Sequence, residues 1–171
     1  MNPNNGTHPA ITRTEDCVAD LRLPVLAGFD AVSYWAIPEG TKPLQGTPDL
    51  VTFFSGYRFY FSSIENLRTF ERNPLKYIPA WGGFCSFGVA NERVWGIDNL
   101  GPFGDPTKWV ISPIDGRLHI FRSRVPMEKF LESPAEHIEA GNSIWNDWFP
   151  ADAGLAPLNT ACICSAICKD A

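Results

Sequence analysis

Two short aromatic runs separated by a serine and a glycine constrain the fold of this chain most. Residues 50–54 and 57–61 are both rich in the β-branched and aromatic side chains that favour strands. The two residues between them, Ser55 and Gly56, are a two-residue hairpin signal. Strands this apolar need a covered face, so the sequence predicts an antiparallel hairpin packed against another element.

The remainder of the chain predicts a second hairpin and a few short helices. Residues 108–112 and 117–121 are strand-like runs on either side of a turn at residues 113–116. Residues 62–65 have the spacing of a capping box and begin a helix that stops before Pro74. A further helix is predicted over residues 125–131. The last helix begins at Ser133 and Pro134, and its apolar positions recur at helical spacing: Ile138, Gly141, Trp145 and Trp148.

These elements predict a single α+β domain. We expect a small antiparallel sheet made of two hairpins, packed with two or three short helices and joined by long ordered loops. A length of 171 residues suits one domain with a sizeable core. Residues 1–16 are expected to form an extended arm, residues 17–150 the domain, and residues 151–171 a cysteine-rich tail.

Charge and hydropathy exclude two classes of partner. The formal net charge is -5, and no run of Lys or Arg is present that could neutralise a row of phosphates, so nucleic-acid binding is not expected. The sequence also has no apolar run of about 18 residues, the length that a membrane-spanning helix needs. The first 16 residues are polar and lack the apolar core of a signal peptide, although the chain could be a mature product.

The cysteines predict either disulfides or a metal site. Cys17 lies near the start, Cys85 is central, and Cys162, Cys164 and Cys168 lie in the tail. The tail offers no histidine, whereas a structural zinc site needs four ligands, so disulfides among Cys17, Cys162, Cys164 and Cys168 are favoured. A bridge from Cys17 to the tail would tie the two chain ends together. The alternative is a thiolate site for copper or zinc.

The segment around Cys85 carries a family resemblance. The sequences NPLKY at residues 73–77 and GGFCSFGVA at 82–90, with GFDAVSY at 28–34 and DPTKW at 105–109, resemble the secreted branch of the YHS-domain proteins. That branch has tyrosines where Phe84 and Phe87 stand here. The resemblance implies an extracellular single domain, and it marks these motif residues: Asp30, Tyr34, Tyr77, Gly82, Gly83, Cys85 and Trp109.

Metal binding is suspected in the compact branch of the same family, where cysteines flank the hairpin. Ser62 and Asn66 stand in that neighbourhood here, so a thiolate site does not carry over. Cys85 is interpreted as a metal ligand or nucleophile, as an inert thiol in an apolar pocket with a raised pKa, or as a partner in a disulfide.

The sequence also predicts the surroundings of the His119 and Asp30 side chains. His119 alternates with Leu118 and Ile120 along a strand, so we expect its side chain to face solvent, with a metal role as the alternative. A trio of Cys85, His119 and Asp105 can be drawn, but nothing in the sequence places a base beside the thiol. Asp30 interrupts apolar surroundings, and we expect it to cap a turn.

These features favour a non-enzymatic extracellular module that acts through protein contacts. We expect it to self-assemble into a filament or surface layer, using its N-terminal arm as a strand added to a neighbour. Asn5 begins a glycosylation sequon in that arm, which matters if the protein is exported. The alternative is a copper- or zinc-binding protein, with the metal held by the tail thiolates of Cys162, Cys164 and Cys168, by Cys85 or by His119.

Overall fold

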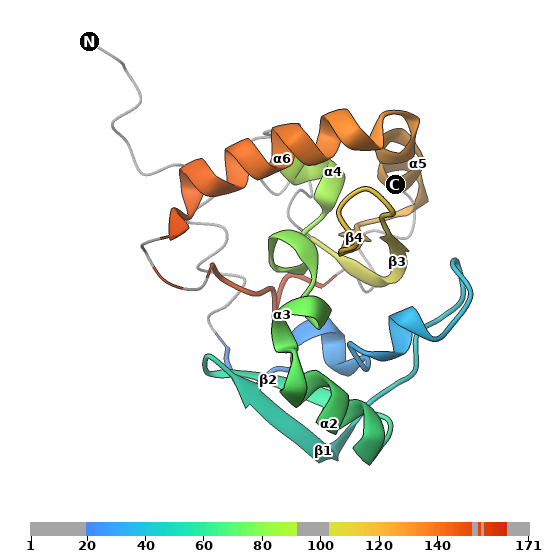
Figure 1. Ribbon diagram of the computed structural model, residues 1–171, viewed down its shortest axis with the longest axis vertical. Coiled ribbons are helices and arrows are strands. Elements are labelled where there is room, and N and C mark those ends of the chain that lie inside the picture. The colour runs from blue at the N-terminus through green and yellow to red at the C-terminus, as the bar shows by residue number, and fades with distance from the viewer. Residues whose placement is uncertain (1–19, 92–102, 152–153, 155, 164–171) are drawn as a thin grey trace.

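The computed structural model describes residues 20–91, 103–151, 154 and 156–163, and it has the predicted α+β architecture (Figure 1). Both predicted hairpins are present. They do not join into one sheet, because each forms a separate two-stranded antiparallel sheet. Helices and ordered loops fill the space between and around the two hairpins.

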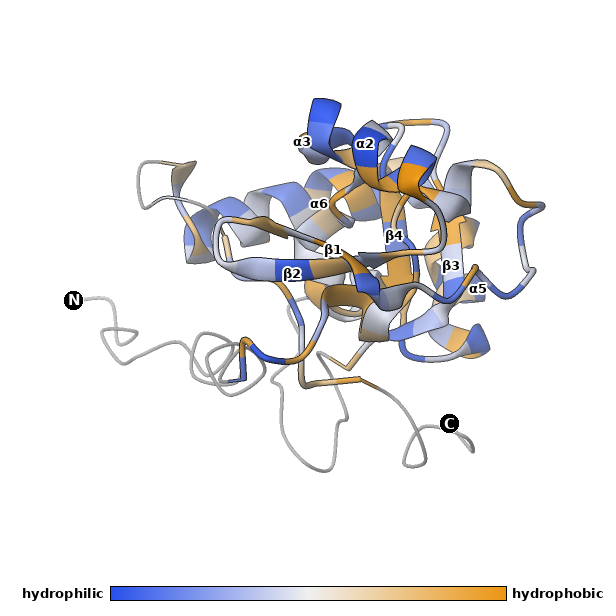
Figure 2. Ribbon diagram, turned by 90° about the horizontal axis from the view of Figure 1, so that it is seen from below, coloured by the Kyte–Doolittle hydropathy of each residue, from blue (hydrophilic) through white to orange (hydrophobic). Residues whose placement is uncertain are grey.

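The first hairpin consists of β1 (Thr47–Phe54) and β2 (Tyr57–Phe61). Its turn residues Ser55 and Gly56 both have positive φ, 48° and 85°, which is the type I′ geometry whose twist matches the strands. Alternate β2 side chains point into the core, where Phe59 and Phe61 are fully buried. In Figure 2 the hairpin lies in the foreground, with α2 and α3 above it in the view.

Helix α2 (Ile64–Arg72) covers the inner face of this hairpin and packs through Phe70. Its cap differs from the expected capping box by one residue. Ser63 is the N-cap, and its side chain accepts a hydrogen bond from the backbone N–H of Asn66. Ser62 is thereby released for a different role, described below.

The second half of the chain supplies the other sheet and most of the helices. β3 (Asp105–Ile111) pairs with β4 (Leu118–Phe121). The remaining α-helices are α3 (Pro74–Tyr77), α4 (Ser86–Ala90), α5 (Arg124–Glu132) and α6 (Pro134–Trp148). The four apolar positions predicted for the last helix are the buried ones of α6, so that prediction is confirmed.

The loops contain three short 3-10 segments, namely η1 (Val25–Gly28), η2 (Ser33–Trp35) and η3 (Ala80–Gly83). Together with α3, they bring the motif residues toward β4. They include non-glycine residues with positive φ, namely Leu26, Ala27 and Trp81. Such strain persists only where surrounding contacts fix the backbone.

The domain has two hydrophobic cores, and β4 is a wall between them. One core contains Phe59, Phe61 and Phe70 of the first hairpin and α2, and it reaches Leu118 and Ile120 of β4. The other core lies under α5 and α6 and includes Phe121. All four β4 residues are therefore buried, on both faces of the strand.

Residues 156–163 return to the domain after α6. Leu158 is a buried member of the first core, and Gly104 donates its backbone N–H to the carbonyl of Cys162 at 3.1 Å. The first part of the predicted tail is thus packed against the domain. Within the described part of the chain, no helix combines the length and the apolarity needed to cross a bilayer.

Candidate functional site

The Asp30 carboxylate is a buried node that joins three segments. Oδ1 accepts hydrogen bonds from the backbone N–H groups of Val32 and Ser33 at 2.9 and 3.2 Å. Oδ2 accepts from the backbone N–H and hydroxyl of Ser62 at 2.9 and 2.6 Å, and from Nδ2 of Asn66 at 2.7 Å. Asp30 caps its turn as expected, and it also fixes the end of β2 and the start of α2.

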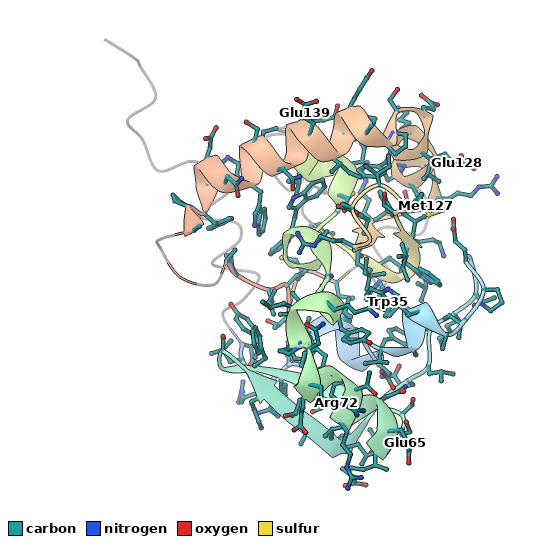
Figure 3. The ribbon with its side chains drawn as sticks, viewed as in Figure 1. Trp35, Glu65, Arg72, Met127, Glu128 and Glu139 are labelled. Atoms are coloured by element: carbon teal, nitrogen blue, oxygen red, sulfur yellow. The ribbon has the colours of Figure 1, made fainter. Side chains whose placement is uncertain are left out.

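The aromatic motif residues are packing groups whose polar atoms are satisfied. The hydroxyl of buried Tyr34 donates to the carbonyl of Pro106 at 3.0 Å, and the Tyr34 ring meets Trp109 edge to face, with centroids 5.1 Å apart. Burial raises the pKa of Tyr34 well above its usual value, and the charges of Asp105 and Asp30 act in the same direction. Tyr77 packs edge to face on Trp35, which is labelled in Figure 3.

Gly82 lets the C-terminal segment approach the motif. Gly82 has a φ of +66°, and a Cβ there would lie 2.2 Å from the carbonyl oxygen of Pro157. Its own carbonyl accepts the backbone N–H of Asn159 at 2.8 Å. Asn159 is buried and also bonds both backbone groups of Cys162 through its side chain. This contact explains Gly82, whereas Gly83 has a φ of +80° and a Cβ there would lie 3.1 Å from Pro79.

His119 does not face solvent, and that expectation was wrong. Its side chain is fully buried, with the ring against Trp81 and Phe130 at centroid distances of 5.1 and 5.2 Å. Nδ1 lies 3.1 Å from Oγ of Ser86, and Nε2 lies 3.1 Å from Oδ2 of Asp115. The alternation argument failed because β4 is covered on both faces by separate cores.

These contacts form a serine–histidine–aspartate chain without access for a substrate. In the neutral histidine, Nε2–H donates to Asp115 and Nδ1 accepts the Ser86 hydroxyl proton, so all three groups are satisfied. Ser86 is fully buried, as is the histidine, so the serine is not presented to a substrate. The chain instead ties α4, β4 and the turn of the second hairpin together.

The trio of Cys85, His119 and Asp105 does not form a hydrogen-bonded chain. Both ring nitrogens of His119 contact Ser86 and Asp115, as described above. The Asp105 carboxylate accepts the backbone N–H and the hydroxyl of Thr107, at 2.8 and 2.7 Å. Sequence reasoning missed Ser86 and Asp115, although the unbroken apolar character around His119 is a signal of a strand buried on both faces.

Cys85 is the motif residue that reaches a cavity. It precedes α4 and forms a parallel bridge with Ile120 of β4. The cavity has a volume of about 130 Å³ and lies between α4, the end of β4 and α5. Besides Cys85, its lining includes Gly88, Arg122, Val125, Pro126 and Lys129.

The thiol of Cys85 is 2 % exposed and is the free cysteine of the described residues. Burial raises its pKa, because the thiolate would lose its hydration. Backbone N–H groups of Arg122, Gly88 and Phe87 point at the sulfur, and these bonds and the charge of Arg122 offset only part of the shift. The group is a neutral thiol at neutral pH, which agrees with the interpretation of an inert cysteine.

The described residues contain no cluster of side chains that would support the metal-binding interpretation. Across residues 20–91, 103–151, 154 and 156–163, no group of three or more His, Cys, Asp and Glu side chains is placed to hold an ion. Cys162 is disulfide-bonded, so its sulfur is not a thiolate ligand in this form. The expected roles of Asn5, Cys17, Cys164 and Cys168 lie outside the described residues.

No family model, no curated protein and no solved structure matches this chain. The site is therefore interpreted from its own geometry. Of the clusters built above, the Asp30 node and the histidine chain are buried and satisfied, whereas the Cys85 cavity and the outer side of the first hairpin face outward.

Proposed function

We propose that the protein is a non-enzymatic module that acts through protein contacts, and that it self-associates through the outer edge of β1. The observation that carries this proposal is the edge itself. β1 is eight residues long, and among the described strands it pairs only with β2. An unpaired edge presents backbone donors and acceptors that another chain can use.

The register of the hairpin says which groups point outward. A two-residue turn makes the flanking pair, Phe54 and Tyr57, a hydrogen-bonded pair. Pairs alternate along the ladder, so the backbone groups of Val51 and Phe53 point away from β2. These groups are the ones available to an added strand.

The face of the hairpin that is turned away from the core adds side-chain contacts. Phe53 is 60 % exposed, and the guanidinium of Arg58 lies 5.5 Å from the centroid of its ring. The exposed Phe53 ring and the cation beside it are therefore groups that an added strand could contact.

The arm of a second copy is the proposed occupant of this edge. The positive charge of Arg58 is one of the causes that lower the pKa of Asp20, after the hydrogen bonds from Arg22. Asp20, the first described residue, is therefore within electrostatic range of Arg58 on the hairpin. An arm tethered at this place can exchange between copies, and repetition of that exchange would build a filament.

An extracellular location is part of the same proposal. A disulfide at Cys162 persists in an oxidising compartment, and Asn5 would be glycosylated only on export. Membership of the YHS-domain family also stays a prediction, supported by the motif residues that meet in and around the two cores.

The test is the oligomeric state of the full chain, measured by sedimentation velocity over a range of concentrations. Self-association is expected, and Phe53→Lys should shift the distribution toward monomer. Ile114→Lys is the matched control, because Ile114 is a similarly exposed apolar residue at the turn of the other hairpin. A chain that is monomeric throughout contradicts the proposal. If deletion of residues 1–16 leaves assembly unchanged, the arm is not the segment that binds the β1 edge. The Phe53→Lys variant then tests separately whether that edge takes part in assembly.

A further inference from the structure

The residues that line the cavity over Cys85 suggest a ligand site in addition to the proposed self-association. Its apolar walls are Phe87, Val125 and Pro126, and its polar groups are the Cys85 thiol and the cationic side chains of Arg122 and Lys129. No described acidic side chain is among the lining residues. Two cationic side chains thus line the cavity, although the net charge of the chain is -5.

We propose that this cavity binds a small oxyanion. Its volume of about 130 Å³ is slightly below that of an engineered cavity of about 150 Å³ that accepts benzene, so it suits a group of a few heavy atoms, such as phosphate or a carboxylate. Two cations around a partly apolar recess favour a negative ligand, because the walls reduce the screening by water.

The protonation state of the thiol supports an anion and disfavours a cation. Because burial raises the pKa of Cys85, the sulfur carries no negative charge that would repel an anion or attract a metal ion. The backbone N–H groups of Phe87, Gly88 and Arg122 already point at the sulfur, and the neutral thiol keeps one proton to donate. The thiol thus acts as a weak donor at the base of the recess.

Helix α5 supplies the cation of Lys129, which forms no ion pair with an acidic side chain among the described residues. Glu128 is bound by Arg124 at 2.6 Å on the exposed side of the helix, and Glu128 is labelled in Figure 3. Lys129, the next residue, is exposed and reaches the cavity. Arg122 approaches from the end of β4, and its charge acts on the Cys85 sulfur. The two cations come from different elements and converge on one recess.

The experiment is an NMR titration of the ¹⁵N-labelled full chain with inorganic phosphate and, separately, with acetate, each at constant ionic strength against chloride. Saturable shifts are expected at the amides of Gly88 and Arg122. A response to phosphate alone, or to acetate alone, assigns the oxyanion. Absence of saturable shifts with both anions overturns the proposal.

Matched variants separate a built site from general attraction to positive charge. Lys129→Gln is expected to weaken binding about threefold to fivefold, the effect of one exposed charge. Lys42→Gln, which removes an exposed lysine that lies over the ring of Phe29 outside the cavity, should leave the affinity unchanged. Equal weakening by both variants, or no weakening by Lys129→Gln, contradicts the site. The oligomeric state measured in parallel tests the proposed function separately.

Discussion

Nε2 of the fully buried His119 lies 3.1 Å from Oδ2 of Asp115, whose side chain is 19 % exposed in the turn of the second hairpin. This pair connects the inside of the domain to a surface turn. Burial by itself would raise the pKa of Asp115. The hydrogen bond from His119 and the positive charge that this histidine carries when it is protonated, with smaller contributions from Arg117, outweigh burial and lower that pKa.

The first prediction concerns acid stability. The pKa of Asp115 is lowered on folding, so its ionised form contributes stability above its unfolded value of 3.8, and this contribution is lost as the pH falls through the lower folded value. Asp115→Asn should therefore cost about 1–2 kcal/mol at pH 7 and less at pH 3. Urea denaturation at both pH values measures the difference. Asp49→Asn is the control, because Asp49 is exposed. An equal loss at both pH values contradicts this account of the pair.

The second prediction concerns the buried carboxylate of Asp30. Asp30→Ala removes the acceptor for five hydrogen bonds and leaves several buried donors unpaired. The free energy of unfolding should fall by at least about 3 kcal/mol. Chemical denaturation measures it, with Glu39→Ala as an exposed control. A loss below 1 kcal/mol, on the order of one ordinary hydrogen bond, would show that the node is dispensable.

The third prediction uses two glycines with nearly the same φ. Gly82 and Gly116 have φ values of +66° and +67°, but a Cβ meets the carbonyl of Pro157 at 2.2 Å only at the first position. Gly116→Ala should cost about 1–2 kcal/mol, the strain of a left-handed residue. Gly82→Ala should cost more, because residues 156–163 must also move. Thermal unfolding and protease sensitivity of the C-terminal segment test this, and equal costs would refute the contact.

The fourth prediction concerns the reactivity of Cys85. A buried thiol with a raised pKa reacts slowly, because the thiolate is the nucleophile. Alkylation of Cys85 in the native chain at pH 7 should be at least about tenfold slower than in denaturant. The rate should rise as the pH is increased above 8. Peptide mass spectrometry after timed labelling resolves this site from the other cysteines. Equal rates in the native and denatured chain would mean that the thiol is accessible and activated.

Local sequence signals were sufficient for the elements whose partners are nearby. The Ser55 and Gly56 turn follows from the need for positive φ between two aromatic strands, and the buried positions of α6 follow from helical periodicity. The cap of α2 was placed one residue early, because Ser62 and Ser63 are equally good caps. Only the Asp30 carboxylate, distant in sequence, distinguishes them.

Cys85 shows the limit of the same reasoning at the site. The sequence marked this thiol among aromatic residues and anticipated a raised pKa. It did not predict the cavity, since Arg122 and Lys129 come from the end of β4 and from α5, more than 35 residues away along the chain. Gly141 is a similar case: it was predicted as a buried helix position, but the reason it is glycine is the Trp81 ring, which a Cβ would meet at 2.3 Å.

The sequence alone determined the α+β class, the two hairpins and the faces of the amphipathic helices, because periodicity and turn chemistry act over a few residues. Tertiary structure decided that the hairpins remain separate sheets and that β4 is covered on both faces. His119 is buried for that reason, since alternation specifies which side chains share a face but not which faces are covered. The environments of Asp30, Cys85 and His119 were likewise set by packing between distant segments.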